Sequence, residues 1–264
     1  MQPQIVGFGA QKAGTTWLFS NLANNAGIWR PPLKEMHYFN HVQSGSSWMF
    51  KGHRLKLKAA REHAIAKGFN HRVSHIDRLT QLPMLSEKWY REAYRPCPPD
   101  KQSMDITPAY ATLDDATMRY MVSLLGSEFK AIYLIRDPAA RAISSVKGAI
   151  TTGKIDEWLE MICARGTRLR SDYRSTVNRL DDILADRVLY LPFGLLKRDP
   201  VTLLRRVENH CGLPEGQYKE PERPKHASSL VAIPEGLHEA VRIVLAEQYK
   251  WLETRFDRET LNQI

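Results

Sequence analysis

Residues 9–17, which read Gly-Ala-Gln-Lys-Ala-Gly-Thr-Thr-Trp, place glycine, a lysine and two neighbouring hydroxyl groups in one short segment. Gly14 allows the backbone to approach a bound group closely, and Lys12 supplies a positive charge. The hydroxyl groups of Thr15 and Thr16 can donate further hydrogen bonds. A phosphate or a similar oxyanion uses all of these features, so the segment is predicted to cradle an anion.

A second candidate anion site begins at Arg136. The sequence Arg-Asp-Pro-Ala-Ala-Arg-Ala-Ile-Ser occupies residues 136–144. The forked guanidinium of an arginine matches the oxygen atoms of a phosphate. Arg141, Ser144 and Ser145 are spaced by three and four residues and would share one face of a helix. This segment is therefore also predicted to hold a phosphate.

A third segment, Pro-Leu-Lys-Glu-Met-His-Tyr-Phe at residues 32–39, brings an amine, a carboxylate and an imidazole within four residues. In an extended chain Glu35 and His37 would point to the same side, so His37 could support Glu35 or replace it as a general base. A purely structural role is the remaining alternative. Nothing in the sequence fixes where the amine of Lys34 points.

Apolar runs indicate the elements that must position these segments. The runs at residues 4–9, 129–135 and 187–193 each predict a strand. Each run is followed by a segment that is predicted to be a helix, at residues 16–22, 138–150 and 200–211. A final amphipathic helix is predicted over residues 237–252.

Strands that alternate with helices favour a parallel sheet. Asp137 suits an N-cap and Pro138 the first helical position, which explains the boundary after the middle strand. The pattern predicts a three-layer α/β fold of the P-loop type, with a central, largely parallel sheet flanked by helices. We expect a single domain over residues 1–264, with its ligand at the carboxyl ends of the strands.

Composition narrows the class of partner. The formal net charge is +9, which suits an anionic partner, and the most basic stretch, residues 51–72, is interpreted as a solvated helix face. The three cysteines, Cys97, Cys163 and Cys211, lack the close spacing of metal or redox motifs. No apolar run approaches the roughly 20 residues that span a membrane. A cytoplasmic location is expected, and no metal is expected.

The first two motifs resemble those of sulfotransferases that use 3′-phosphoadenosine 5′-phosphosulfate (PAPS) as donor. Lys12-Ala13-Gly14-Thr15-Thr16-Trp17-Leu18 resembles the loop that binds the donor's 5′-phosphosulfate, and the segment at 136–144 resembles the 3′-phosphate motif. The resemblance implies sulfuryl transfer to a hydroxyl or amine, with 3′,5′-adenosine bisphosphate as product. The donor contacts it implies are Gln11, Lys12, Ala13, Gly14, Thr15, Thr16, Trp17, Arg136, Ser144 and Lys225.

The segment at residues 34–39 is similar to one found in the heparan-sulfate type of these enzymes, where a glutamate acts as general base. That likeness assigns the base to Glu35, and His37 remains the alternative from the residues themselves. By analogy with phosphoryl transfer, Lys12 and the loop amides would face the leaving group. The likeness to the heparan-sulfate type also makes a carbohydrate or another small molecule the expected acceptor. Weaker likenesses suggest Asp105 and Tyr110 as acceptor contacts and Tyr173 as a residue facing the nucleotide or acceptor.

Two other classes remain open at the level of sequence. A P-loop kinase would use ATP and Mg²⁺, with Asp137 as metal ligand, but its lysine would directly follow the second glycine of the loop. A non-catalytic module that binds RNA or another polyanion would also be basic. We find no RNA-reading motif and no aromatic platform, so no nucleic-acid partner is expected. The acceptor and the oligomeric state are left open.

Overall fold

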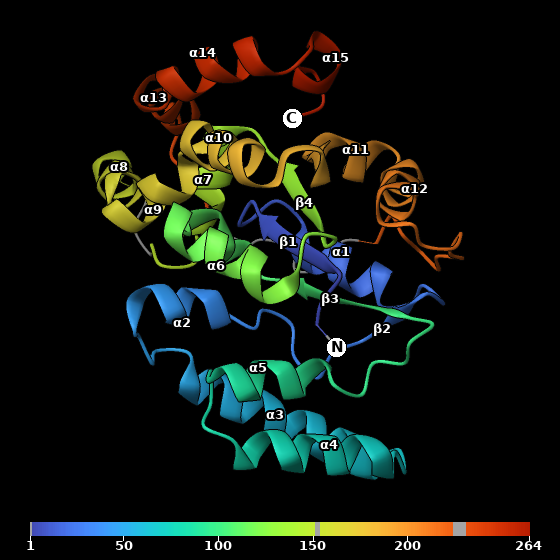
Figure 1. The fold of residues 1–264 in the computed structure, drawn as a ribbon. Coiled ribbons are helices and arrows are strands. Elements are labelled where there is room, and N and C mark those ends of the chain that lie inside the picture. Colours follow the sequence, from blue (N-terminus) through green and yellow to red (C-terminus); the bar gives the residue numbers. More distant parts are fainter. Residues whose placement is uncertain (1, 151–153, 224–230) are drawn as a thin grey trace.

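The computed structural model describes residues 2–150, 154–223 and 231–264. A five-stranded sheet with the order β2-β3-β1-β4-β5 forms its centre, and every neighbouring pair of strands is parallel. Figure 1 shows this sheet between two groups of helices, with α3, α4 and α5 beyond its β2–β3 side and α13, α14 and α15 beyond the other. The strands are β1 (Ile5–Gly9), β2 (Ile28–Trp29), β3 (Gln102–Ile106), β4 (Lys130–Ile135) and β5 (Val188–Pro192).

The helices fill the connections between the strands and the segment after β5. Those in the first half of the chain are α1 (Thr15–Leu22), α2 (Tyr38–Ser44), α3 (Phe50–Ala66), α4 (Asn70–Gln81), α5 (Glu87–Tyr94), the 3₁₀ helix η1 (Pro108–Thr112) and α6 (Asp115–Leu125). Those in the second half are α7 (Pro138–Val146), α8 (Ile155–Cys163), α9 (Arg165–Ser171), α10 (Tyr173–Leu184), η2 (Ala185–Arg187), α11 (Phe193–Arg198), α12 (Pro200–Cys211), α13 (Leu237–Val244), α14 (Ala246–Arg255) and α15 (Arg258–Leu261).

The strands predicted from apolar runs are confirmed as β1, β4 and β5. All five residues of β1 are buried, as continuous apolar strands in a covered parallel sheet must be. In register, Ile5 lies beside Met104 on one side and Lys130 on the other. The sheet is therefore central and parallel, as the alternation of elements predicted.

Helix boundaries follow local capping. The carboxylate of Asp137 accepts a hydrogen bond from the main-chain nitrogen of Ala140, with Pro138 in the first turn of α7. Asp199 caps α12 in the same way, and Gly212 ends it with φ 62°. The predicted C-terminal helix is instead two helices, α13 and α14, which meet at Leu245.

Two clusters of buried apolar side chains stabilise this arrangement. The larger surrounds the sheet and continues into α3, α4 and α5. The smaller joins α7, α8 and α13, with Trp158 fully buried within it. The basic stretch after residue 50 forms α3 and the start of α4, and the buried residues of α3 are only His53, Leu57 and Ala64, so this stretch is helical and largely exposed.

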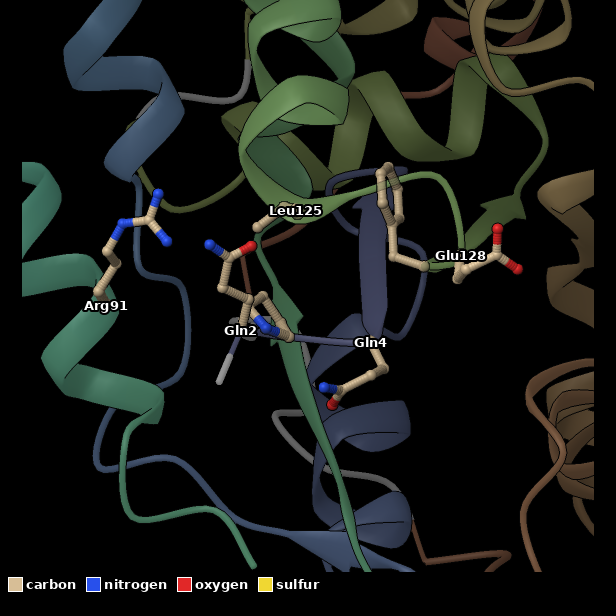
Figure 2. Close-up of a pocket in the computed structure, with 7 residues that line it drawn as sticks. Gln2, Gln4, Arg91, Leu125 and Glu128 are labelled. Atoms are coloured by element: carbon tan, nitrogen blue, oxygen red, sulfur yellow. The ribbon is translucent and has the colours of Figure 1, made fainter. Parts of the chain in front are cut away.

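A surface hollow lies at the amino ends of β1 and β4. It is lined by residues 2–4, Arg91, Leu125, Glu128 and Phe129, and Figure 2 shows Arg91 reaching toward it from α5 while Glu128 points away. The segments singled out by the sequence follow the opposite, carboxyl ends of the strands, so this hollow is separate from them. Among the described residues no helix is long and apolar enough to cross a membrane.

Candidate functional site

The loop at residues 9–14 connects the end of β1 to the start of α1, as predicted. Gly14 stands at the N-cap of α1 with φ 86°, and no side chain caps this end. The first N–H groups of a helix have no partner within it, so those of Thr15 and Thr16 are available to an anion. Lys12 is exposed at the mouth of the loop and has φ 70°.

The loop has no room for a side chain at Gly14. A Cβ atom there would lie 2.5 Å from Cδ1 of Leu196 and 3.3 Å from Cε2 of Phe193. Both neighbours belong to α11, the helix that follows β5, so this helix supplies a wall of the loop. Phe193 was predicted only as the last residue of a strand and not as part of the site.

Arg136 joins the two anion motifs. Its Nη1 donates a hydrogen bond of 2.6 Å to the carbonyl of Lys12, and its guanidinium lies 4.8 Å from the centre of the Phe193 ring. Burial lowers the pKa of Arg136, and nearby Tyr173 and Asp137 only partly offset this. Among the residues described, no carboxylate lies within 4 Å of this guanidinium, which leaves it able to bind an anion.

Buried Tyr173 holds the backbone at Arg136, in the connection between β4 and α7. Its hydroxyl donates a hydrogen bond of 2.8 Å to the carbonyl of Arg136 and accepts a 3.4 Å bond from the main-chain nitrogen of the same residue. Tyr173 is completely shielded from solvent, so it does not face a ligand as expected but holds the backbone from behind. Ser144 is half-buried two residues before the end of α7, whereas Arg141 is fully buried.

Asp137 is occupied within the protein. Its Oδ1 accepts from the nitrogen of Ala140 at 2.7 Å, and its Oδ2 accepts from the hydroxyl of Tyr249 at 2.7 Å and from Arg242 at 3.5 Å. A helix cap with both oxygens engaged is a structural aspartate rather than an open metal ligand. In the described ranges no three His, Cys, Asp or Glu side chains are grouped as a metal site.

Lys34, Glu35 and His37 meet in the connection from β2 to α2. Oε1 of Glu35 forms an ion pair with Nζ of Lys34, and its Oε2 lies 3.5 Å from Nε2 of His37. The expected contact of Glu35 with His37 is present, but the chain is not extended. Glu35 has φ 62° and His37 has φ 54°, a left-handed conformation that is costly for residues other than glycine.

The electrostatics of Glu35 favour its anion. Burial raises the pKa of this carboxyl, but hydrogen bonding to His37 and the charge of Lys34 outweigh burial and lower it to about 2. A carboxylate so stabilised stays ionised across the neutral range. The ammonium of Lys34 helps to lower this pKa, so the carboxylate would become more basic if Lys34 moved away from it.

Asn40, which the sequence analysis did not single out, orients His37. Its amide nitrogen donates to the carbonyl of Ala109 at 3.0 Å, so its Oδ1 faces Nδ1 of His37 at 3.1 Å and accepts from it. Nε2 of His37 is thereby left toward Glu35. The buried ring of His53 supports the same segment, since its Nε2 bonds to the carbonyl of Met36 at 3.0 Å. No local pattern would have marked Asn40, because its partner lies 69 residues away.

Asp105 and Tyr110 lie behind the site rather than in it. Both are buried, and the carboxylate of Asp105 accepts from Tyr110 at 2.8 Å, Tyr90 at 3.0 Å and Thr107 at 2.6 Å. Burial raises the pKa of Asp105 although these three hydroxyl groups act to lower it. The two residues support the start of η1 and do not contact an acceptor in this arrangement.

Trp48 is the exposed neighbour of the catalytic candidates. Its side chain is 65% exposed, and the centre of its ring lies 5.3 Å from that of His37, with 67° between the ring planes. It belongs to the short connection between α2 and α3. An indole left open beside a candidate base offers an apolar surface to a bound molecule.

The chain near the predicted Lys225 also approaches α1. Nε1 of Trp17 donates a 2.6 Å hydrogen bond to the carbonyl of Pro221, across 204 residues. Trp17 itself is buried. Lys225, predicted as a donor contact, lies outside the described residues.

The sequence matches the family model of the sulfotransferase family over residues 3–217. The chain belongs to the sulfotransferase family. Among curated protein sequences none matches it.

Solved sulfotransferase structures share the fold. A sulfotransferase from Alicyclobacillus acidocaldarius superposes with a TM-score of 0.66 at 18% identity, covering 96% of this chain and 95% of that one. A sulfotransferase domain from the curacin biosynthetic pathway gives a TM-score of 0.53 at 14% identity, over 99% and 96% of the two chains. One from Mycobacterium avium gives 0.51 at 14% identity, over 97% and 77%. At these identities the likeness concerns the fold, whose layers this sulfotransferase shares.

Proposed function

We propose that this sulfotransferase moves a sulfuryl group from PAPS to a hydroxyl or amine of a small-molecule or carbohydrate acceptor. The observation that carries the proposal is the hydrogen bond from Arg136 to the carbonyl of Lys12. It brings the two phosphate-type motifs to one edge of the sheet, and between them lies a guanidinium that pairs with no carboxylate in the described part of the chain. A donor with phosphate groups at both its 5′ and 3′ positions matches such a paired site.

Residues of the two motifs would hold the donor. The loop of residues 11–17, with its main-chain N–H groups and Lys12, suits the 5′-phosphosulfate, and Arg136 with Ser144 suits the 3′-phosphate. The start of α1, where no side chain caps the helix, supports this fit because its first N–H groups have no partner in the helix. Lys225 remains a predicted donor contact. Because charge gathers on the leaving phosphate, Lys12 and the amides would stabilise the transition state.

Glu35 would act as general base toward the acceptor. As the acceptor oxygen or nitrogen bonds to sulfur, the bond from sulfur to the phosphate oxygen breaks, and the acceptor's proton passes to the carboxylate. His37, held by Asn40, would orient Glu35. Trp48 lies beside His37 and is the natural contact for the body of the acceptor.

A kinase that uses ATP and Mg²⁺ is the rival function. The engagement of both oxygens of Asp137 argues against it, since that aspartate would have to bind the metal. The two proposals differ in the nucleotide they require.

Calorimetric titration of the purified protein tests the choice. We expect 3′,5′-adenosine bisphosphate to bind without metal, in the micromolar range or tighter, and ATP with Mg²⁺ to bind more weakly. Tight binding of ATP with Mg²⁺ and indifference to the bisphosphate would overturn the proposal. Transfer of radiolabelled sulfate from PAPS to an added panel of sugars and alcohols would then establish the acceptor.

A further inference from the structure

Arg141 is a fully buried arginine in the middle of α7. It exposes none of its surface, yet it is among the largest side chains in the interior. Its Nη2 donates to Oγ of Ser171 and, at 3.4 Å, to the carbonyl of Thr167, both in α9. Its Nε and Nη1 have no hydrogen-bond partner within the described part of the chain.

The charge of Arg141 is not compensated. Over residues 2–150, 154–223 and 231–264 no carboxylate forms an ion pair with it. The charged groups that face it are the like charges of Arg170 and Arg136, alongside the phenols of Tyr173 and Tyr133. Burial lowers the pKa of Arg141, and the two arginines lower it further. A buried charge without a counter-charge is strongly unfavourable for folding.

The hydrogen bonds of Arg141 do not explain why the charge is kept. Oγ of Ser171 also donates to the carbonyl of Thr167 at 2.8 Å, so both partners stay satisfied when the guanidinium is removed. An apolar side chain of similar length could fill the same space without this cost. The contacts of Arg141 within the protein therefore do not offset the cost of burying its charge.

The position of Arg141 suggests what offsets that cost. It stands one turn before Ser144 on α7, and it packs by Tyr173, whose hydroxyl holds the backbone of Arg136. Interactions through a poorly solvated interior are screened far less than those across water. A 3′-phosphate held by Arg136 and Ser144 would supply the missing negative charge.

We propose that Arg141 is a buried cation of the donor site, which strengthens binding of the 3′-phosphate through its field and without touching it. The inference rests on the proposed PAPS-dependent function. In this view the free protein carries an unfavourable charge that ligand binding compensates. The alternative is that Arg141 merely fastens α9 to α7.

Three variants separate these accounts. Arg141→Met removes the charge and keeps the bulk, Arg141→Lys keeps the charge without the fork, and Arg168→Met removes a solvent-exposed charge from the same neighbouring helix. Each is titrated with 3′,5′-adenosine bisphosphate and with adenosine 5′-phosphate, which lacks the 3′-phosphate. Thermal unfolding is followed with and without the bisphosphate.

For Arg141→Met we expect affinity for the bisphosphate to fall about tenfold, while affinity for adenosine 5′-phosphate changes less than about threefold. The free variant should unfold at or above the wild-type temperature, and the bisphosphate should stabilise it less. Arg168→Met should bind both ligands within about threefold of wild type, and Arg141→Lys should bind the bisphosphate with an affinity between those of wild type and Arg141→Met, because burial favours the neutral form of a lysine.

A less stable Arg141→Met variant with an unchanged ratio of the two affinities would overturn the inference and support a fastening role. If the wild-type protein itself failed to bind the bisphosphate, the proposed function would fail, which is a different result from an unchanged ratio in a protein that binds it.

Discussion

The guanidinium of Arg136 donates a hydrogen bond to the carbonyl of Lys12, across 124 residues of sequence. This contact sets the end of β4 against the loop after β1, which are neighbours in the sheet. It also turns the fork of Arg136 toward the loop, so one side chain can shape the loop and bind an anion. The two motifs thus form one site.

Replacing Arg136 by Ala should raise the dissociation constant for 3′,5′-adenosine bisphosphate by about 10–100-fold, because a charge-assisted hydrogen bond to phosphate is lost. The dissociation constant of Arg136→Lys should lie between those of wild type and Arg136→Ala, because lysine keeps the charge but lacks the forked guanidinium. Metal-free calorimetry measures both. The control is Arg119→Ala, which removes an exposed arginine from α6. If Arg136→Ala bound the bisphosphate within twofold of wild type, Arg136 would not be a contact of the 3′-phosphate.

Glu35→Gln should slow sulfuryl transfer by about 10²–10³-fold while the affinity for the bisphosphate changes less than about threefold, because the base meets the acceptor and not the donor. Single-turnover transfer from PAPS measures the chemical step. Unchanged transfer in this variant would pass the role of base to His37 or to the acceptor itself.

The same variant has a signature in folding. The pKa of Glu35 is lowered from 4.5 to about 2, so its ion pairs stabilise the folded state above about pH 4.5, and this stabilisation is lost as the pH falls toward 2. Glu35→Gln should therefore cost about 1–3 kcal/mol at pH 7 and progressively less in acid, as measured by urea unfolding.

Lys34→Met should make Glu35 more basic. The ammonium of Lys34 helps to hold the pKa of Glu35 down, so its removal raises that pKa. The acidic limb of the profile of kcat/KM against pH should then move to higher pH, whereas Lys58→Met, an exposed charge on α3, should leave it in place. An unmoved limb in Lys34→Met would show that Glu35 does not control it.

Gly14→Ala should destabilise the protein by about 2–4 kcal/mol, because its φ of 86° is strained for alanine and the new Cβ meets Leu196. In the double variant with Leu196→Ala, the stability lost to the positive φ at residue 14 should not be recovered. Gly45→Ala, where φ is 64° and the space is open, is the matched control and should cost only about 1 kcal/mol. Equal losses in the two single variants, by urea unfolding, would rule out the crowding at Gly14.

Asp105→Ala should cost about 3–5 kcal/mol of stability, since three buried hydroxyl groups lose their common acceptor. Asp105→Asn keeps an acceptor and should cost less. Because burial raises the pKa of Asp105 in the folded state, stability from its protonated form is lost as the pH rises above its usual pKa of 3.8, so Asp105→Asn should gain on wild type over that rise. Parallel pH curves for the two proteins would contradict this.

Several strands and helix boundaries were predictable because residues close together in the sequence determine them. The apolar runs at β1, β4 and β5, the cap at Asp137 and the stop at Gly212 each depend on residues near one another in sequence. The strands β2 and β3 were not predicted. The first has two residues, and the second buries polar Ser103 and Asp105, so their pairing in the sheet rather than their composition makes them strands.

The residue types at the candidate site came from the sequence, and their roles remain a proposal. Only the tertiary structure decided how they meet: the left-handed backbone at Glu35 and His37, the tie from Asn40 to Ala109, and the burial of Arg141 and Tyr173. Spacing along the chain specifies a helix face or a loop, but which side of it meets solvent is set by packing against elements far away in sequence. The motifs determined what could bind, and long-range packing determined which groups are free to bind it.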